Sequence, residues 1–479
     1  AFSFSKDGKF LAFLSPLSAE ERKLEDKGKF PPPPPKSELE AEQRKIEKEL
    51  AETENVDPRV YNGLPFKEGT SFVGDKFSHI YILDLKDEKA KPVRITKTEA
   101  DHTPPKWAPN GKYIWTTTAK KPTHDRRESP NVIRIDVKTK EIKKFSRDGF
   151  NTMDPHPSPD GKNVVCFSST IKGGWAHIAK LSQFKAAGGG YKDLNEELDR
   201  SIMGLQWNDT GSSLYTLVGD NGDVEVHSFS AADGKHEKLL KGRRYITGFS
   251  INKAGDILFT AATPMSPTEV FLAPAGSSRP RQLTKYNKPL LEEVVVCKTE
   301  EMKFKAPDGK TIQGWVIKPD GFDPKKKYPL AMNIHGGPHV MWSDSMPSMW
   351  IEWQHHAARG YVVFYCNPRG SDGYGNEFRT AIFNSWGEAD LPDQMAGVDT
   401  LVEKGFIDTK RMALTGGSYG GFMTLWTIGH DKRFAAAVSQ RGVYNLTSFW
   451  GTTDIPRLIE DEFDVFPFDD PEYMHKYSP

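Results

Sequence analysis

The chain has 479 residues and is poor in cysteine, in net charge and in long apolar runs. Its three cysteines, Cys166, Cys297 and Cys366, are far apart in the sequence. This spacing excludes a metal-like or redox pair and favours a reducing, cytoplasmic location. The 65 basic and 65 acidic side chains cancel, so no basic field for nucleic acid or an anionic membrane is expected. No apolar run is long enough to cross a bilayer.

The length and the start of the chain indicate how it is organised. A chain of 479 residues is too long for one hydrophobic core, so two large domains or more are expected. The first residues, Ala-Phe-Ser-Phe-Ser-Lys-Asp, are not a signal peptide. They lack an initiator methionine and open inside a repeat, so we expect that sequence is missing before residue 1.

The first half of the chain repeats a pattern of apolar run, Asp/Asn-Gly turn and apolar run. The turn glycines are Gly8, Gly111, Gly161, Gly211 and, in a fainter copy, Gly255. After a first wide gap they recur 50, 50 and 44 residues apart. Glycine adopts positive φ at low cost, and the β-rich residues on both sides predict a hairpin at each turn.

The repeat predicts a β-propeller over residues 1–290. Second strand pairs are expected in most units, for example at residues 79–85 and 132–137, and four strands per unit at this period form a propeller blade. A β-sandwich with regular hairpins is the alternative. An insertion at about residues 16–70 interrupts the first copy, with a polyproline spacer at 31–35 and a charged, solvated helix or mobile arm at 36–54.

The second half, residues 291–479, has a different pattern. A hairpin is expected at residues 302–317, followed by buried strands at 330–334, 361–365 and 412–414. Helical stretches at 350–359 and 389–404 separate these strands. Alternating buried strands and helices predict a parallel sheet, here an incomplete α/β-hydrolase domain.

Ser418 lies in the sequence Gly-Gly-Ser-Tyr-Gly-Gly, between a short apolar strand and a helical stretch. A serine held between glycines on a strand-to-helix turn is the nucleophile elbow of an α/β-hydrolase. The turn lifts the hydroxyl out of the sheet and places the next amide, that of Tyr419, beside the reaction centre. The alternative is a glycine-rich turn with an ordinary serine.

Two further loops are expected beside Ser418. Residues 335–339, His-Gly-Gly-Pro-His, follow one predicted strand, and the turn-rich residues 366–375 follow the next. Ligands of such sheets bind outside the carboxyl ends of the strands, so these loops and Ser418 belong to one crevice. The small glycines after His335 let a backbone amide approach a substrate carbonyl, which is the arrangement of an oxyanion hole.

Taken together, these motifs resemble the prolyl oligopeptidase family of serine peptidases, with the acylaminoacyl-peptidase and dipeptidyl-peptidase-like branch the most similar. The resemblance covers nearly the whole chain, including the repeat. The motifs that carry it are residues 335–338, 367–375, 416–422, 440–445 and 451–455.

The resemblance implies roles for particular residues. Ser418 is the nucleophile, and the backbone amides of Gly337 and Tyr419 form the oxyanion hole. Phe449 and Trp450 fall where family members line the pocket for the residue before the scissile bond, although an aromatic pair there also suits a core. Arg369 is a further candidate for substrate contact. No metal or organic cofactor is implied, because the histidines form no ligand-spaced cluster.

A serine nucleophile needs a histidine base and a carboxylate that orients it. In the family both follow the serine at a distance, but only 61 residues follow Ser418 here. His430 and His475 are poorly placed for this role, and His335 and His339 suit loop contacts. Asp390, Asp393 and Asp399 are expected at the surface or at helix caps. We therefore expect that the triad Asp and His are not in this chain and that residues 1–479 alone show no peptidase turnover.

The expected function is hydrolysis of short peptides through an acyl-enzyme on Ser418. The enzyme would be either an oligopeptidase or an exopeptidase that releases N-acylaminoacyl or dipeptidyl units, and the residues leave endo- and exo-cleavage open. A carboxylesterase on the same scaffold is one alternative, since the chemistry is the same and only the pocket differs. A non-catalytic propeller protein that binds peptides or proteins is another. An unpaired edge strand of the incomplete sheet would favour homo-oligomers and aggregation.

Overall fold

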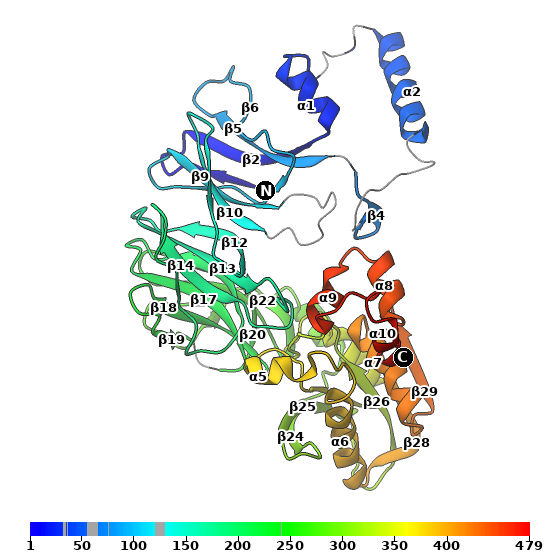
Figure 1. Cartoon of the computed structure of the whole chain (residues 1–479). Helices are drawn as coiled ribbons and strands as arrows, with labels where there is room; N and C mark the ends of the chain where they lie inside the picture. The colour runs from blue at the N-terminus through cyan, green and yellow to red at the C-terminus, as the bar shows by residue number, and fades with distance from the viewer. Residues whose placement is uncertain (32–34, 36, 55–65, 75, 120–129, 241) are drawn as a thin grey trace. The chain divides into compact units, whose positions relative to one another are not determined.

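The computed structural model describes residues 1–31, 35, 37–54, 66–74, 76–119, 130–240 and 242–479 (Figure 1). Contacts divide the chain into two compact units, residues 1–157 with 451–456 and residues 158–450 with 457–479. Most of the predicted polyproline spacer, residues 32–34, lies outside the described residues. The division into domains at residue 290 stays a prediction.

The first unit is built mainly of antiparallel strands. They are β1 (Phe2–Phe4), β2 (Phe10–Leu17), β3 (Lys67–Glu68), β4 (Ser71–Phe72), β5 (Phe77–Asp84), β6 (Val93–Arg94), β7 (Asp101–His102), β8 (Lys106–Trp107), β9 (Tyr113–Ala119), β10 (Asn131–Asp136), β11 (Ile142–Phe145) and β12 (Phe150–Pro157). One sheet has the order β1-β2-β5-β6, and another has the order β11-β10-β9-β7 with β8 paired to β9. The predicted second strands at 79–85 and 132–137 are thereby confirmed as β5 and β10.

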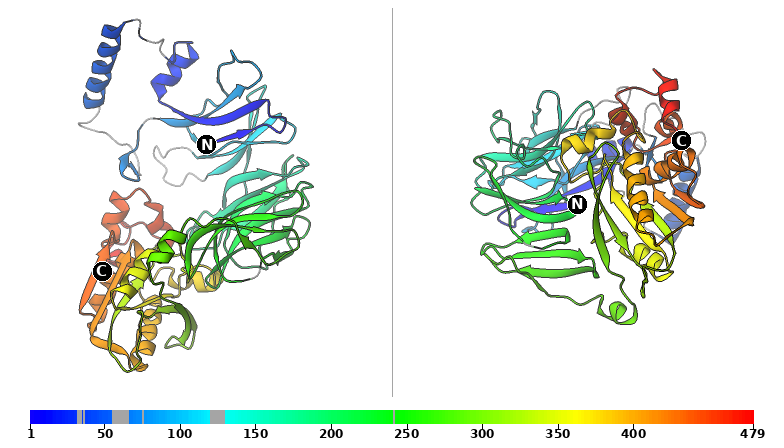
Figure 2. Two further views of the ribbon diagram at one scale, coloured as in Figure 1. Left: turned by 180° about the vertical axis from the view of Figure 1, so that it is seen from behind. Right: turned by 90° about the horizontal axis from the view of Figure 1, so that it is seen from below.

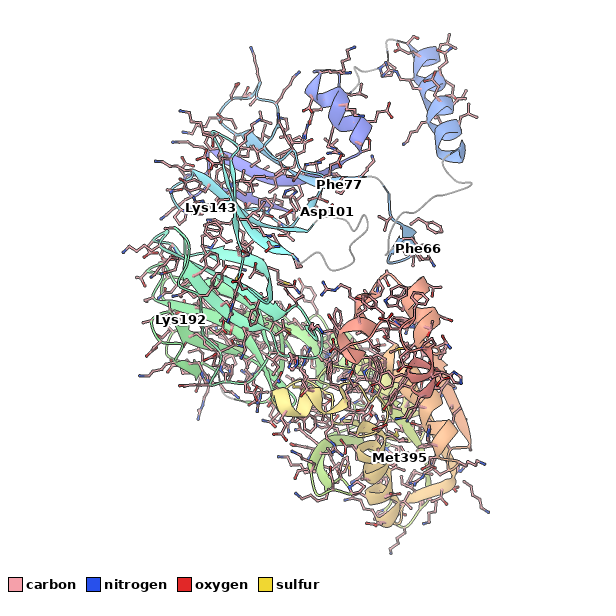
Figure 3. All side chains as sticks on the ribbon, in the orientation of Figure 1. Phe66, Phe77, Asp101, Lys143, Lys192 and Met395 are labelled. Atoms are coloured by element: carbon pink, nitrogen blue, oxygen red, sulfur yellow. The ribbon has the colours of Figure 1, made fainter. Side chains whose placement is uncertain are left out.

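The core of the first unit is formed by side chains that point to one face of these strands. Successive side chains of a strand point to opposite faces, so residues two apart, such as Ile80 and Ile82, or Ile133 and Ile135, share a face. These side chains pack with Trp107 and neighbouring residues in one buried cluster. Phe77 and Asp101, both labelled in Figure 3, mark where β5 and β7 begin, and the Asp101 carboxylate accepts a hydrogen bond from the Ser78 amide at 2.8 Å.

Two helices follow β2 in the first unit, α1 (Ala19–Asp26) and α2 (Glu38–Glu54). A reciprocal capping box starts α1, because the Ser18 hydroxyl accepts from the Glu21 amide and the Glu21 carboxylate accepts from the Ser18 amide. Helix α2 confirms the helix predicted at residues 36–54. Its apolar side chains Leu39, Ile46 and Leu50 are exposed, as expected for a solvated helix.

The second unit begins with further antiparallel strands. They are β13 (Asn163–Thr170), β14 (Lys180–Lys185), β15 (Lys192–Asp193), β16 (Ile202–Trp207), β17 (Ser213–Asp220), β18 (Asp223–Ser230), β19 (His236–Lys238), β20 (Tyr245–Ile251), β21 (Ile257–Thr263), β22 (Ser266–Ala273) and β23 (Arg281–Gln282). Strands β16 to β19 pair in chain order, as do β20 to β23. A single parallel pairing, Val224 with Tyr245, joins β18 to β20.

The predicted turns are present and precede β2, β9, β13, β17 and β21. At one of them Gly111 has φ +67°, its amide donates to the Ala108 carbonyl at 2.9 Å, and the Asn110 side chain accepts from the Lys112 amide at 2.9 Å. The corresponding glycines 8, 161, 211 and 255 also have positive φ. The Asp/Asn-Gly pattern therefore predicted the position of each turn correctly.

The second unit continues as a mixed sheet with helices (Figure 2). Its strands are β24 (Thr299–Lys305), β25 (Thr311–Ile317), β26 (Tyr328–Ile334), β27 (Val362–Asn367), β28 (Ile407–Gly417) and β29 (Ala436–Gln440). They have the order β24-β25-β27-β26-β28-β29, and β27, β26, β28 and β29 run parallel. The hairpin and the buried strands predicted from the sequence are confirmed.

The helices that follow β23 are α3 (Lys288–Glu293), α4 (Trp350–Ala358), α5 (Asn376–Arg379), the 3-10 helix η1 (Thr380–Ile382), α6 (Asp390–Glu403), α7 (Tyr419–His430), α8 (Leu446–Thr452), α9 (Arg457–Phe463) and α10 (Pro471–Lys476). Tyr365 packs on Trp353 of α4, with ring centroids 3.7 Å apart. Its neighbour Phe364 lies on the opposite face of β27, where Gly397 of α6 lets it pack closely. Helices α4 and α6 thus cover opposite faces, and Met395 of α6 (Figure 3) is buried.

In the described parts of the chain, no helix combines the length and the apolar character needed to cross a bilayer.

Candidate active site

Strand β28 ends at Gly417 and helix α7 begins at Tyr419, so Ser418 alone makes the turn between them. Ser418 has φ +58° and ψ −122°, a conformation that non-glycine residues adopt at a cost of about 1–3 kcal/mol when the surroundings enforce it. Its amide donates to the Gln440 carbonyl at 3.0 Å, and its carbonyl accepts from the amides of Gly421 and Phe422. The predicted strand-serine-helix turn is therefore present, with the serine side chain exposed.

The glycines around Ser418 are required by close packing. A Cβ on Gly420 would lie 2.3 Å from the Ile334 carbonyl oxygen, and one on Gly416 would lie 2.5 Å from the Gly420 carbonyl oxygen. A Cβ on Gly421 would lie 2.6 Å from the Gln440 carbonyl oxygen. These contacts are with backbone atoms, which cannot move aside as side chains can. The turn therefore excludes larger residues at all three positions.

Two backbone amides beside Ser418 have the properties of oxyanion-hole donors. A Cβ on Gly336 would come within 3.3 Å of the Ser418 Cβ, so the loop after β26 passes directly by the serine. Among the described residues, neither the Gly337 amide nor the Tyr419 amide donates a backbone hydrogen bond. Both amides remain available to a developing oxyanion. Their assignment as the oxyanion hole stays a prediction.

The Ser418 hydroxyl opens into a cleft of about 470 Å³. Its lining includes Asn333, Trp342, Glu352 and Arg441, which come from β26, the following loop, α4 and the residue after β29. Two of these groups are polar and poorly satisfied. The Asn333 side-chain oxygen is buried and has no hydrogen-bond partner in the described structure. The Arg441 guanidinium has no ion pair there, and it lies 3.6 Å from the place of a Cβ on Gly417.

The sequence motifs did not single out these lining residues. Arg441 belongs to a motif that resembles the family, whereas Asn333, Trp342 and Glu352 belong to none of the motifs. Strand order carried the missing signal, because residues that end neighbouring parallel strands meet at one edge. Glu352 lies far from every motif in the sequence, so no local pattern predicts that it lines the cleft.

A buried carboxylate supports the position of Tyr419. The Tyr419 hydroxyl donates to Asp390 Oδ2, and the Gly387 amide donates to Asp390 Oδ1 at 2.9 Å. Asp390 is completely buried, and this burial raises its pKa to about 6. Asp390 and Asp393 were expected at the surface or at helix caps. Both lie at the start of a helix, in the first turn of α6, but neither is at the surface, because Tyr419 and Arg369 pack against their carboxylates.

The histidines near the site form hydrogen bonds with groups other than the Ser418 hydroxyl. His335 is buried, with Nδ1 2.8 Å from the Gly336 carbonyl and Nε2 2.9 Å from the Ser371 hydroxyl, and burial lowers its pKa to about 4. His339 contacts the Gly370 carbonyl and Glu462 through its two ring nitrogens. His430 Nδ1 lies 2.8 Å from the Trp426 carbonyl. Within the residues that the structure describes, no histidine or carboxylate forms a hydrogen bond with the Ser418 hydroxyl.

The remaining predicted substrate contacts lie away from the cleft lining. Arg369 forms a bidentate pair with Asp393, at 2.7 and 2.9 Å, and a further ion pair with Asp308. Trp450 is buried, and its indole N–H donates to Glu460 at 2.8 Å. Neither these residues nor Phe449 line the cleft at Ser418. Their roles in binding substrate stay predictions that the geometry does not support.

Comparison with known proteins identifies the class. The family model of the prolyl oligopeptidase family matches residues 347–479. The chain is 30% identical over 453 residues to the uncharacterized peptidase YuxL of Bacillus subtilis, covering 90% of this chain and 68% of that protein. It is 27% identical over 308 residues to dipeptidyl-peptidase 5 of Porphyromonas gingivalis, covering 64% of this chain and 44% of that protein.

A solved structure shares the fold. The acylaminoacyl peptidase of Pyrococcus horikoshii matches all of this chain and 69% of its own, with a TM-score of 0.77 and 20% identity. Together with the matches in sequence, this result confirms the predicted resemblance. The chain belongs to the prolyl oligopeptidase family, a family of serine-type peptidases.

Proposed function

We propose that this chain carries the nucleophile of a peptidase that hydrolyses short peptides through an acyl-enzyme on Ser418. The observation that carries the proposal is the backbone of Ser418, held at φ +58° between β28 and α7 by glycines that closely packed backbone atoms require. This geometry exposes the hydroxyl to the cleft, and in the described structure the amides of Gly337 and Tyr419, the proposed oxyanion-hole donors, donate no backbone hydrogen bond. The names of the peptidase relatives support a peptide as substrate.

The chemistry follows from these groups. The Ser418 oxygen attacks the peptide carbonyl carbon while a base takes its proton, and the carbonyl oxygen becomes an anion that the two amides stabilise. Loss of the amine, which receives the proton, leaves an ester on Ser418. Water then adds to this ester under the same base, and the carboxylic acid product leaves.

The base and its orienting acid are not supplied by residues 1–479 in this proposal. Among the described residues that line the cleft there is no histidine, and Glu352 is the one carboxylate. We therefore propose that residues 1–479 alone bind peptide without turnover. The chain spans 68% and 44% of the lengths of the two relatives described above, so the activity of the whole protein stays part of the proposal.

We also propose that the antiparallel sheets of residues 1–290 form blades of a β-propeller, of which this chain holds a part. The similarity to an acylaminoacyl peptidase fold supports this assignment. A propeller beside the catalytic domain would admit short peptides and exclude folded proteins. A cytoplasmic location and homo-oligomers belong to the same proposal, together with release of N-acylaminoacyl or dipeptidyl units.

The absent base favours one other function for this chain, namely peptide binding without catalysis. A carboxylesterase would need the same triad, so that absence does not favour it.

A fluorophosphonate probe and a chromogenic peptide test the proposal. The probe and an N-acetyl-alanine anilide are applied to residues 1–479 and to the whole gene product, each with a Ser418→Ala control. We expect Ser418-dependent labelling and turnover in the whole product and no turnover by residues 1–479. Brisk, Ser418-dependent turnover by residues 1–479 would refute the proposal that the base lies outside these residues. An unlabelled Ser418 in the whole product would favour a binding protein.

A further inference from the structure

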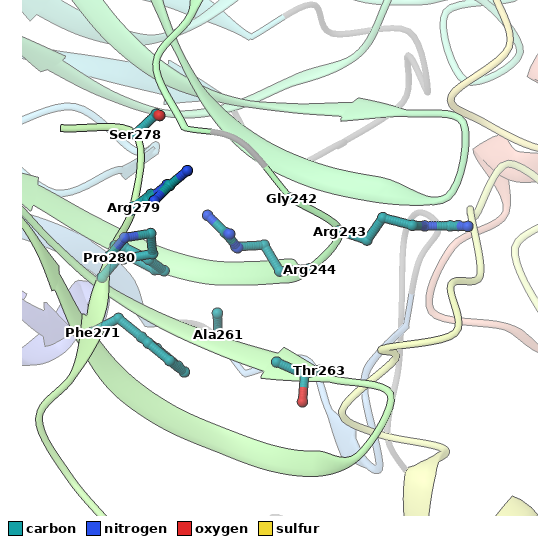
Figure 4. A pocket seen from close by; sticks show the side chains of 10 residues that line it. Gly242, Arg243, Arg244, Ala261, Thr263, Phe271, Ser278, Arg279 and Pro280 are labelled. Carbon is teal, nitrogen blue, oxygen red and sulfur yellow. The ribbon is translucent and has the colours of Figure 1, made fainter. Parts of the chain in front are cut away.

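A second hollow, of about 480 Å³, lies in the second unit and shares no lining residue with the Ser418 cleft. We call it the arginine pocket (Figure 4). Its walls come from the residues before β20, one side of β21 and β22, and the residues before β23. The lining includes Arg243, Arg244 and Arg279 together with the rings of Phe259, Phe271 and Pro280, and no Asp or Glu is among its described residues.

The three arginines differ in where their charges point. Arg243 extends away from the other two (Figure 4) and pairs with Glu301, and with Asp223 and Asp344 at 3.6 Å each. Arg244 and Arg279 extend toward each other across the hollow. Two like charges that face one another in a partly sheltered space repel. The pocket therefore presents two cationic groups to anything that enters it.

The guanidinium groups of Arg244 and Arg279 differ in how close they lie to acidic side chains. Arg279 is exposed, and within the described structure no carboxylate lies within 4 Å of its guanidinium. Arg244 lies over the Phe259 ring at 5.7 Å and is influenced by Glu225 and Asp223. Burial lowers the pKa of Arg244, whereas Glu225 and Asp223 act in the opposite direction. An anion between the two guanidinium groups would relieve their repulsion.

We propose that the arginine pocket binds a small organic carboxylate that carries an apolar group. Guanidinium groups match the planar carboxylate with paired hydrogen bonds, and Arg244 and Arg279 approach from two sides. Phe259, Phe271 and Pro280 provide an apolar wall for the substituent, as in most small-molecule sites. This wall favours a carboxylate such as an N-acyl amino acid over inorganic phosphate. The proposal does not depend on Ser418 being catalytic.

The test compares three probes on residues 1–479. N-Acetyl-L-phenylalanine, its uncharged amide and inorganic phosphate are titrated at constant ionic strength and followed by calorimetry or ligand-detected NMR. A ligand of this size is expected to bind with a Kd of about 1 mM. We expect the acid to bind, the amide to bind at least about tenfold more weakly, and phosphate not to displace the acid, because a hydrogen-bonded charge pair is lost in the amide.

Substitutions locate the binding to the pocket. Arg279→Gln should weaken binding of the acid about tenfold or more, and Arg279→Lys should weaken it less because the charge remains. Arg411→Gln is the matched control, since Arg411 is exposed and pairs only with Asp408 in the described structure. Equal binding of acid and amide, equal affinities of Arg279→Gln and Arg411→Gln, no binding of the acid, or binding of phosphate in its place would each overturn the proposal.

Discussion

Glycine serves two different purposes in the two regions of this molecule. At Gly111, in a turn of the antiparallel repeat, φ is +67° and a Cβ would meet nothing within 4 Å. At Gly420, after the serine elbow, φ is ordinary and a Cβ would lie 2.3 Å from a backbone oxygen. The repeat needs glycine for its conformation, whereas the elbow needs it for space. The same residue type therefore predicts different consequences of substitution in the two regions.

The largest effect is expected for Gly420→Ala. The added methyl group collides with the Ile334 carbonyl, and overpacking against backbone costs about 3 kcal/mol or more. Strand β28 should lose hydrogen-exchange protection, and fluorophosphonate labelling of Ser418 should fall in the whole gene product. Gly429→Ala in the same helix is the control, because a Cβ there meets nothing within 4 Å and should stabilise α7 slightly. Equal effects of both substitutions would contradict the steric explanation.

The stability of the elbow region should depend on pH through the buried carboxylate of Asp390. The pKa of Asp390 is raised to about 6 by burial, so the folded state favours its protonated form below that pH. Its contribution to stability is present below about pH 4 and is lost as pH rises through about 6, on the order of 3 kcal/mol. Asp390→Asn should remove this loss of stability for α6. Hydrogen exchange measured at about pH 3.5 and at about pH 7, on the two sides of the titration, checks it.

Asp154 in the first unit should change stability with pH in the opposite direction, because its pKa is lowered. Its hydrogen bond with His156 and the charge of Lys106 outweigh burial and lower its pKa. Its stabilisation is therefore present above the ordinary carboxyl pKa and is lost as pH falls. Asp154→Asn should reduce the stability of the first unit at pH 7. If both substitutions changed stability in the same direction at pH 7, the assigned pKa shifts would be wrong.

The conformational role of Gly111 predicts a smaller effect. Gly111→Ala keeps the space but forces a Cβ into left-handed backbone, which costs about 1–2 kcal/mol. Gly111→Asn should cost less, because asparagine tolerates this region. Hydrogen exchange of β9 measures both variants. An alanine variant as stable as the asparagine variant would show that the turn does not depend on φ.

The smallest effect tests strain at Ser418. Its φ of +58° and ψ of −122° match the first central position of a type II′ turn, which glycine prefers. Ser418→Gly should therefore raise the stability of the elbow by about 1 kcal/mol, whereas Ser418→Ala should not. Both variants abolish labelling, so stability alone separates them. A Gly variant no more stable than the Ala variant would argue against strain.

Local chemistry made much of this molecule predictable from sequence. The Asp/Asn-Gly turns, the alternating strands and the glycines around Ser418 are all features of neighbouring residues, and the structure has them where they were expected. The burial of Asp390 was not predicted, since an aspartate in the first turn of a helix usually faces water. The ion pairs of Arg369 with Asp393 and Asp308 were not predicted either.

Local patterns in the sequence were enough to predict the family, the elbow and the position of each repeat turn, because glycine stands where the backbone needs positive φ or little space. The atoms that impose this need at the elbow, in Ile334 and Gln440, are brought there by the fold. Tertiary structure alone decided which side chains surround Ser418 and which histidines are occupied. Asn333 and Arg441 reach the cleft because β26 and β29 pair with the two sides of β28, the strand that leads to Ser418, and Glu352 joins them from α4. Contacts between residues far apart in sequence arise from strand order and packing, and no local pattern encodes them.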